Sequence, residues 1–326
     1  MGADAVLAGH RVLERAEWTA REAAHAQRAH ALTAAAVERR GRGQAHPVED
    51  FLFTYYSWAP GRLRRWHPGV GVELLGAGER EGWAHYAGTG RGVVVDAASV
   101  GGGGGVGGGG GVGGSQVAPP GGGGAGAAPP RPPPRGSTVR LARDVLAATR
   151  TRPAQLGCFG LHEWAMVHRS SPEQVRHAGL PLRLGHAGTD AVVESHRIRC
   201  SHYDAFRFFT PSAVPRNELT PTREGQAAQE QPGCLHATMD CYRWAMKLSP
   251  AVPGELLLDC FELARDVREL DMRASPYDVA PLGYEPVPIE TPEGKAQYVR
   301  AQRAFAERAD PLRAALVEVC DAVLSA

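Results

Sequence analysis

Three short segments of the chain place histidines and carboxylates among apolar and aromatic residues. The first segment, CFGLHEWAMVHR over residues 158–169, sets His162 beside Glu163 in an otherwise apolar run. Such a pair is expected to bond internally or to bind a ligand, because burying an unpartnered charge is costly. The alternative is a histidine that is satisfied in the core and a glutamate that lies on the surface.

The second segment, SHYDAFRFFTP over residues 201–211, combines His202 and Asp204 with arginine and several aromatic rings. Aromatic faces beside a carboxylate and a cation suit a planar or cationic ligand. On a helix, His202 would face Phe206 whereas Asp204 would face Phe208, so the histidine and the acid need not converge. The alternative is core packing with a carboxylate at a helix start. The candidate substrate-binding residues of this segment are Tyr203, Phe206, Arg207 and Phe209.

The third segment, GCLHATMDCYRWAMKLSP over residues 233–250, holds His236 and Asp240 four residues apart. On a helix these two side chains share a face, which is the spacing that a metal site or a histidine–carboxylate pair requires. Arg243 and Lys247 continue the same face, so a solvated polar stripe is the alternative interpretation.

One hypothesis joins all three segments into a metal centre inside a helical bundle. The metal-ligand candidates are His162, His202 and His236, together with Glu163 and Asp240. Imidazole and carboxylate ligands suit iron, manganese or zinc. The protein would then be a metal-dependent enzyme acting on a small molecule. A noncatalytic helical interaction protein is a further alternative.

The elements that position these residues are predicted to be almost all helices. Apolar periodicity with proline and glycine boundaries favours a mainly α, multi-helix bundle with few or no strands. One stretch, residues 192–198, fits either a strand or the end of a short helix. The predicted helices span residues 12–40, 47–58, 137–149, 158–169, 201–209, 235–248, 253–273, 293–308 and 311–324.

Glycine and proline divide the chain. It contains 41 Gly and 25 Pro, and they dominate residues 101–136, where the only charged residues are Arg131 and Arg135. This composition offers little to bury, so the segment is predicted to be a low-complexity disordered insert. Residues 1–100 and 137–326 are predicted to pack together as one helical domain. Without the two arginines of the insert, the formal charge changes from +1 to −1.

Composition argues against several classes of protein. No apolar run approaches the roughly 18 residues of a membrane helix, so no membrane partner is expected. Asp4 and Glu14 interrupt any secretory signal pattern, and the six cysteines have no repeated short spacing. These features favour a cytoplasmic protein with reduced thiols. The near-neutral charge also argues against a polybasic surface for nonspecific nucleic-acid binding.

Four stretches of the sequence resemble a group of proteins from high-GC bacteria that are labelled 3-methyladenine DNA glycosylase and are not of the helix-hairpin-helix type. The resemblance covers most of the chain from about Ala16 onward, outside the insert. The stretches are HPVEDFLFTYYSWAPGRLRRWHPGVGVEL, CFGLHEWAMV, SHYDAFRFFTP and EQPGCLHATMDCYRWAMKLSPAVPGELLLDCFELARDVRELDMRASPYD.

The resemblance implies DNA as a partner, no cofactor, and hydrolysis of the N-glycosyl bond of alkylated purines such as 3-methyladenine. An enzyme of this kind flips the damaged base out of the duplex and stacks the cationic ring on aromatic side chains. A carboxylate then activates water or stabilises positive charge on the sugar. The candidates for that carboxylate are Asp204 and Asp240, followed by Glu163.

Overall fold

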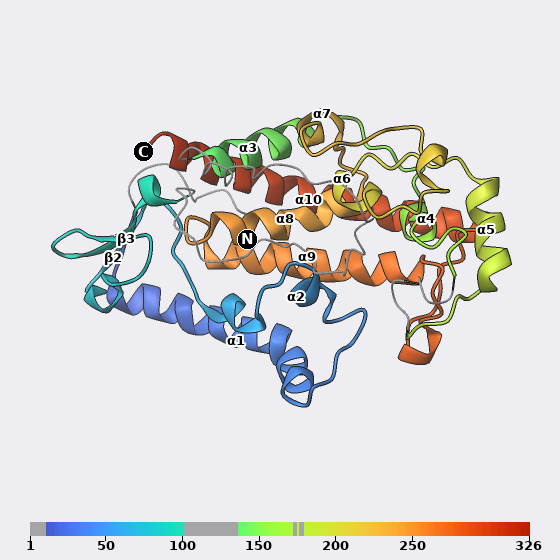
Figure 1. Cartoon of the computed structure of the whole chain (residues 1–326). Helices are drawn as coiled ribbons and strands as arrows, with labels where there is room; N and C mark the ends of the chain where they lie inside the picture. Colours follow the sequence, from blue (N-terminus) through green and yellow to red (C-terminus); the bar gives the residue numbers. More distant parts are fainter. Residues whose placement is uncertain (1–10, 101–135, 172–174, 176–178) are drawn as a thin grey trace, which may run out of the picture.

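The computed structural model describes residues 11–100, 136–171, 175 and 179–326, and it is mainly α-helical as predicted. Three long helices lie side by side through the centre of the molecule (Figure 1). They are α8 (Leu235–Leu248), α9 (Gly254–Arg273) and α10 (Pro292–Leu324), and α3 (Ser137–Arg150) packs against α10. Among the described residues, no helix has the length and apolar content needed to cross a membrane.

The central helices are held by an apolar stripe on one side and by ion pairs on the other. On α9, Leu263 and Val267 are buried. Two acidic residues of α9 face α1 (Arg15–Gly41), where Arg28 forms ion pairs with Asp259 at 2.7 Å and with Glu262 at 2.8 Å. These two carboxylates therefore join α9 to α1.

A small sheet has its first strand before α1 and its other strands after α2 (Phe51–Tyr55). Its strands are β1 (Arg11–Leu13), β2 (Val72–Leu75), β3 (Tyr86–Gly88) and β4 (Gly92–Val95), in the order β1-β2-β4-β3. β1 pairs parallel with β2, and the other two pairings are antiparallel. Gly92 is required in β4, because a Cβ there would overlap the carbonyl oxygen of Leu74.

Short helices connect the longer ones. They are α4 (Leu161–Ala165), α5 (Gly185–Ser195), α6 (Tyr203–Phe206) and α7 (Gln226–Gln229). The prediction of a helix over 158–169 was too long, because Phe159 and Gly160 have positive φ angles of 48° and 71° and Arg169 has one of 52°. The predicted helix over 47–58 is likewise reduced to α2. Single 3-10 turns span Pro60–Arg64, Gly78–Arg80, Ala97–Ser99, Val214–Arg216 and Ala280–Leu282.

The prediction that the C-terminal region forms two helices broken at Pro311 was wrong. α10 runs through Pro311 without interruption. Proline removes one backbone hydrogen bond from a helix interior. α10 packs against α3, α8 and α9 and has buried residues on both sides of Pro311, and this burial offsets that loss.

One hydrophobic core contains residues from both sides of the Gly/Pro-rich insert. Trp18 and Trp66 from the first hundred residues join Trp164, Tyr242 and Phe261 from the rest, all at most 2% exposed. The predicted insert over 101–136 lies outside the described residues, except for Gly136, which precedes α3.

Candidate functional site

The candidate site lies where α4 and α6 meet the first turns of α8 and the last turns of α9 (Figure 1). α4 is fixed to the end of α9 because the indole Nε1 of buried Trp164 donates a hydrogen bond to the carbonyl oxygen of Ala274, at 2.8 Å. This bond brings His162, on the first turn of α4, against the last turn of α9.

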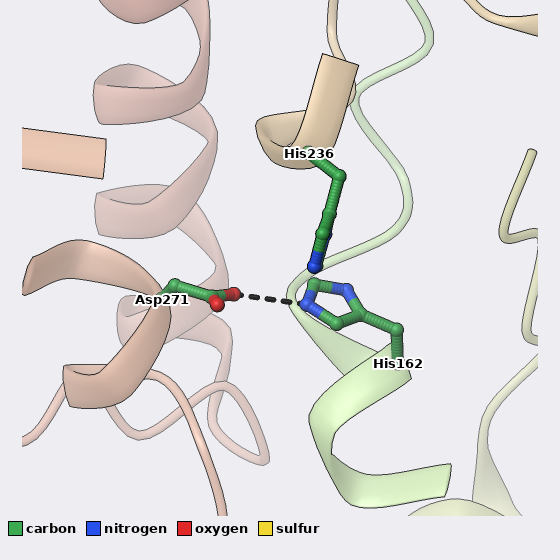
Figure 2. Close-up of side chains that lie close together, drawn as sticks. All are labelled: His162, His236 and Asp271. Atoms are coloured by element: carbon green, nitrogen blue, oxygen red, sulfur yellow. Dashed lines mark ion pairs between the residues drawn. The ribbon is translucent and has the colours of Figure 1, made fainter. Parts of the chain in front are cut away.

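His162, His236 and Asp271 point toward one another (Figure 2) and are called the His162 cluster below. His162 Nε2 lies 2.9 Å from Asp271 Oδ1, and the two imidazole centroids are 4.4 Å apart. One ligand atom from each residue lies within 4.8 Å of the others. His162 is 3% exposed, Asp271 0% and His236 9%.

Two of the facing atoms of this cluster pair with each other. His162 Nε2 and Asp271 Oδ1 form an ion pair at 2.9 Å, whereas His236 Nδ1 has no hydrogen-bond partner among the described residues. Two ligand atoms about 2.1 Å from one ion, at angles of about 90–110°, lie about 3.0–3.4 Å apart. The spacing of His162 and Asp271 is close to that of two ligands of a shared ion.

Arg268 holds the carboxylates around the His162 cluster. Its Nη1 donates to Glu163 Oε1 and to Asp271 Oδ2, both at 2.9 Å. The bond to Oδ2 leaves Asp271 Oδ1 directed at the histidines. Such support of a ligating group by a neighbour sets its orientation.

His202, Glu230 and Asp240 form a second buried group, the His202 cluster. His202 Nε2 lies 3.2 Å from Asp240 Oδ2 and 3.4 Å from Glu230 Oε1. Arg243 also contacts Asp240. Burial raises the pKa of Asp240, but Arg243 and His202 outweigh burial and lower it to about 2. A guanidinium therefore already supplies a cation to this cluster.

The two clusters together contain more acid than permanent cation. Burial lowers the pKa of His162, but Asp271 outweighs burial and raises it well above its usual value. The pKa of His236 is lowered by burial and by the other two histidines, so this imidazole is neutral. Burial lowers the pKa of His202 as well, but Glu230 and Asp240 outweigh burial and raise it. Protonated His162 and His202 would together balance the two charges by which the five carboxylates exceed the three guanidiniums, so a metal ion would have to displace the proton of His162. The groups are Glu163, Asp204, Glu230, Asp240, Asp271, Arg207, Arg243 and Arg268.

A small pocket leads to His236. Its volume is about 10 Å³, which is room for about one water molecule. The pocket connects the His162 cluster with the aromatic segment of α6. It is lined by Phe51, Tyr55, Glu163, Met166, Asp204, Phe208 and His236.

The nominated carboxylates lie around this pocket, and each has an arginine partner. Glu163 and Asp204 line it, whereas Asp240 belongs to the His202 cluster. Asp204 forms ion pairs with Arg207 at 3.0 Å and with Arg243 at 2.8 Å.

The aromatic residues nominated in the segment 201–211 do not line the pocket. Phe206 and Phe209 pack on each other with ring centroids 5.2 Å apart, and Tyr203 also lies outside the pocket lining. Phe208, which was not nominated, lines the pocket instead.

The structure brings the three nominated histidines together but divides them between two clusters. His236 contacts both of the others, with ring centroids 4.4 Å from His162 and 5.3 Å from His202. His202 forms a histidine–carboxylate pair with Asp240.

Sequence reasoning missed Asp271 and Glu230. Asp271 lies four residues after buried Val267, on the apolar face of α9. A carboxylate on the apolar face of a helix is unusual, and this position could have identified Asp271 as a site residue. Glu230 follows α7 directly, where no periodic pattern marks it.

Comparisons with known proteins do not place the chain in a family. No protein-family model, curated protein or solved structure matches it.

Proposed function

We propose that the protein is a metal-dependent hydrolase of small molecules, with one divalent ion held by His162, His236 and Asp271. The observation that carries this proposal is the convergence of buried nitrogen and oxygen atoms of these three residues within 4.8 Å of one another. One of them, His236 Nδ1, has no hydrogen-bond partner among the described residues, and a metal ion would supply one.

Two imidazoles and one carboxylate are a ligand set for zinc, iron(II) or manganese. A metal of this kind supplies Lewis acidity and lowers the pKa of a bound water. Asp271 would ligate through Oδ1, since Arg268 occupies Oδ2. Glu163 lines the pocket beside His236, so it is the proposed general base for the water.

The narrowness of the pocket supports a small substrate, or a substrate that presents one small group. A second pocket, between α1 and α2, has a volume of about 410 Å³. None of the nominated carboxylates lines that pocket. A purine-sized group would therefore fit into that second pocket, but it would not contact the nominated carboxylates there.

The test is the metal content of purified protein. We expect close to one zinc, iron or manganese ion per chain after reconstitution, and a loss of at least about tenfold in affinity in His236→Gln and Asp271→Asn. His202→Gln is the matched control, because it changes the His202 cluster and should retain the ion. Absence of bound metal from the folded wild-type protein would overturn the proposal.

A DNA glycosylase is the second candidate, favoured by the pocket lining. Glu163 and Asp204 share that lining with Phe51, Tyr55 and Phe208, which is the mixture of acid and aromatic groups that a cationic base requires. Release of 3-methyladenine from methylated DNA, in the presence of a chelator, tests this candidate. Full release by Asp204→Asn, Asp240→Asn and Glu163→Gln would exclude it.

A further inference from the structure

The larger of the two pockets lies between the C-terminal end of α1 and α2 (Figure 1) and is called the α1–α2 pocket below. Its volume of about 410 Å³ is in the range of roughly 300–1,000 Å³ that small-molecule sites occupy. The short α2 lies between the two pockets, because Phe51 and Tyr55 line the pocket at His236 whereas Phe53 and Thr54 line the α1–α2 pocket. The α1–α2 pocket is therefore a separate site.

Two aromatic rings in the lining of this pocket are held in place by packing. Trp58 is 6% exposed, and its ring stacks on that of Tyr56 with centroids 5.3 Å apart and an interplanar angle of 17°. Phe53 packs against Phe261 with ring centroids 5.4 Å apart. Because Trp58 and Phe53 both line the pocket, they offer fixed apolar surfaces for the planar ring of a ligand.

The lining also contains a hydrogen-bond donor, the indole N–H of Trp58. An indole hydrogen bond to the protein is donated by three of the four other buried tryptophans, namely Trp18, Trp66 and Trp164. No such bond from Trp58 is found in the part of the chain that the structure describes, and its nitrogen is not enclosed by protein as that of Trp244 is. This donor suits an acceptor atom of a ligand.

Arg40, on the last turn of α1, gives the pocket a cation. Its neighbours Arg39 and Arg42 pair with carboxylates, whereas no ion pair of the exposed Arg40 is found among the described residues. The one acid in the lining, Asp50, accepts hydrogen bonds from Arg39 Nε at 3.0 Å and from the backbone nitrogen of His46 at 2.8 Å. The lining thus has one unpaired charge, the positive charge of Arg40.

We infer that the α1–α2 pocket binds a small aromatic carboxylate. The carboxylate accepts hydrogen bonds from the Arg40 guanidinium, whose planar fork matches it, and the ring lies against Phe53 and Trp58. One unpaired cation matches a monoanion, and the negative charge of Asp50 in the same lining opposes a dianion such as phosphate. The inference goes beyond the proposed function and does not depend on the metal centre.

The test is calorimetric titration of the full-length protein with 2-naphthoate, with and without a metal chelator. We expect saturable binding in both conditions, and a dissociation constant about tenfold higher in Arg40→Gln, which loses a charge-assisted hydrogen bond. Arg42→Gln is the matched control, because it removes the same charge from the same end of α1 without changing the pocket lining. 2-Naphthamide, which has the ring without the charge, should bind about tenfold more weakly than the acid.

A further variant tests the position of the ligand. Ala45→Trp, at an exposed position of the lining, should abolish binding of 2-naphthoate by filling the pocket. Circular dichroism of each variant confirms that it is folded.

Three outcomes overturn the inference. The first is undetectable binding of 2-naphthoate to the folded wild type at millimolar concentrations. The second is an equal dissociation constant for Arg40→Gln and Arg42→Gln, or for the acid and the amide, because Arg40 would then not recognise the carboxylate. The third is binding that Ala45→Trp retains and that Glu163→Gln or the chelator abolishes, which would place the ligand at His236. Absence of bound metal, in contrast, refutes only the proposed function.

Discussion

His162 Nε2 and Asp271 Oδ1 form a buried ion pair at 2.9 Å, and the ring of His236 lies beside them (Figure 2). Burial lowers the pKa of His162, but Asp271 outweighs burial and raises it well above its usual value. A metal ion that binds at this point would therefore displace the proton of His162. The predictions below follow from this arrangement and from the charges around it.

Arg268 is predicted to be essential for the stability of the site. It is 1% exposed and bonds to both Glu163 and Asp271, so Arg268→Gln leaves two buried carboxylates without their cation. Breaking a buried ion pair from one side costs about 3–5 kcal/mol of unfolding free energy. Urea denaturation of the metal-free protein measures this cost, and a loss below about 1 kcal/mol would contradict the assigned role.

Metal affinity is predicted to fall as the pH falls. The pKa of His162 is raised in the metal-free protein, so binding must displace a proton from its imidazole. Below that pKa, the apparent affinity should drop by up to about tenfold per pH unit. Zinc titration against a competing chelator at several pH values measures the slope, and a flat profile in the acid range would exclude His162 as a ligand.

The free energy of unfolding is predicted to decrease at acid pH because of His67, a residue that lies far along the chain from both clusters. Burial lowers the pKa of His67 to about 3, with nearby arginines adding to the effect. The unfolded chain takes up a proton near pH 6.5 that the folded chain excludes. Unfolding free energy therefore decreases with falling pH between these values, by up to about 1.4 kcal/mol per pH unit.

The change His67→Gln should flatten this acid dependence. Denaturation curves between pH 7 and pH 4 compare the variant with His30→Gln, which alters an exposed residue of α1. Identical slopes for His67→Gln and the wild type would show that His67 is not kept neutral by the fold.

Deletion of residues 101–136 is predicted to leave folding and activity intact. The segment is almost entirely glycine, proline, alanine and valine, so it contributes few side chains to a core. Thermal unfolding and metal content of the deletion variant check this, with a short Gly-Ser connector joining the ends. Loss of either property would assign the segment a role in the fold.

The long helices were predictable because their apolar residues recur at helical spacing on one face. α8 has the bounds that its flanking prolines and glycine predict, and α9 begins one residue later than predicted. α10 was divided wrongly, because a local rule for proline was given more weight than packing along the whole helix. The sheet was not foreseen, because its strands are only three or four residues long and glycines interrupt the segments between them.

The candidate site was predictable in its residue types but not in its partners. His162 and His236 could be singled out because each is a polar residue within a largely apolar segment, and both belong to the His162 cluster. Asp271 was overlooked, because the other acids of α9 form a more regular and more conspicuous stripe. Its partnership with His162 depends on the short α4 and on the Trp164 bond to Ala274, which are tertiary features.

The residues of the His162 cluster come from three helices, the consecutive α8 and α9 and the much earlier α4. An ion bound there would act as a cross-link that exists only after the chain has closed two long loops. Ligand binding of this kind stabilises the native state by mass action and gives nothing to the unfolded chain. The thermal midpoint should then depend on the free metal concentration. The ion would stabilise only the completely folded chain, in addition to its role in the reaction.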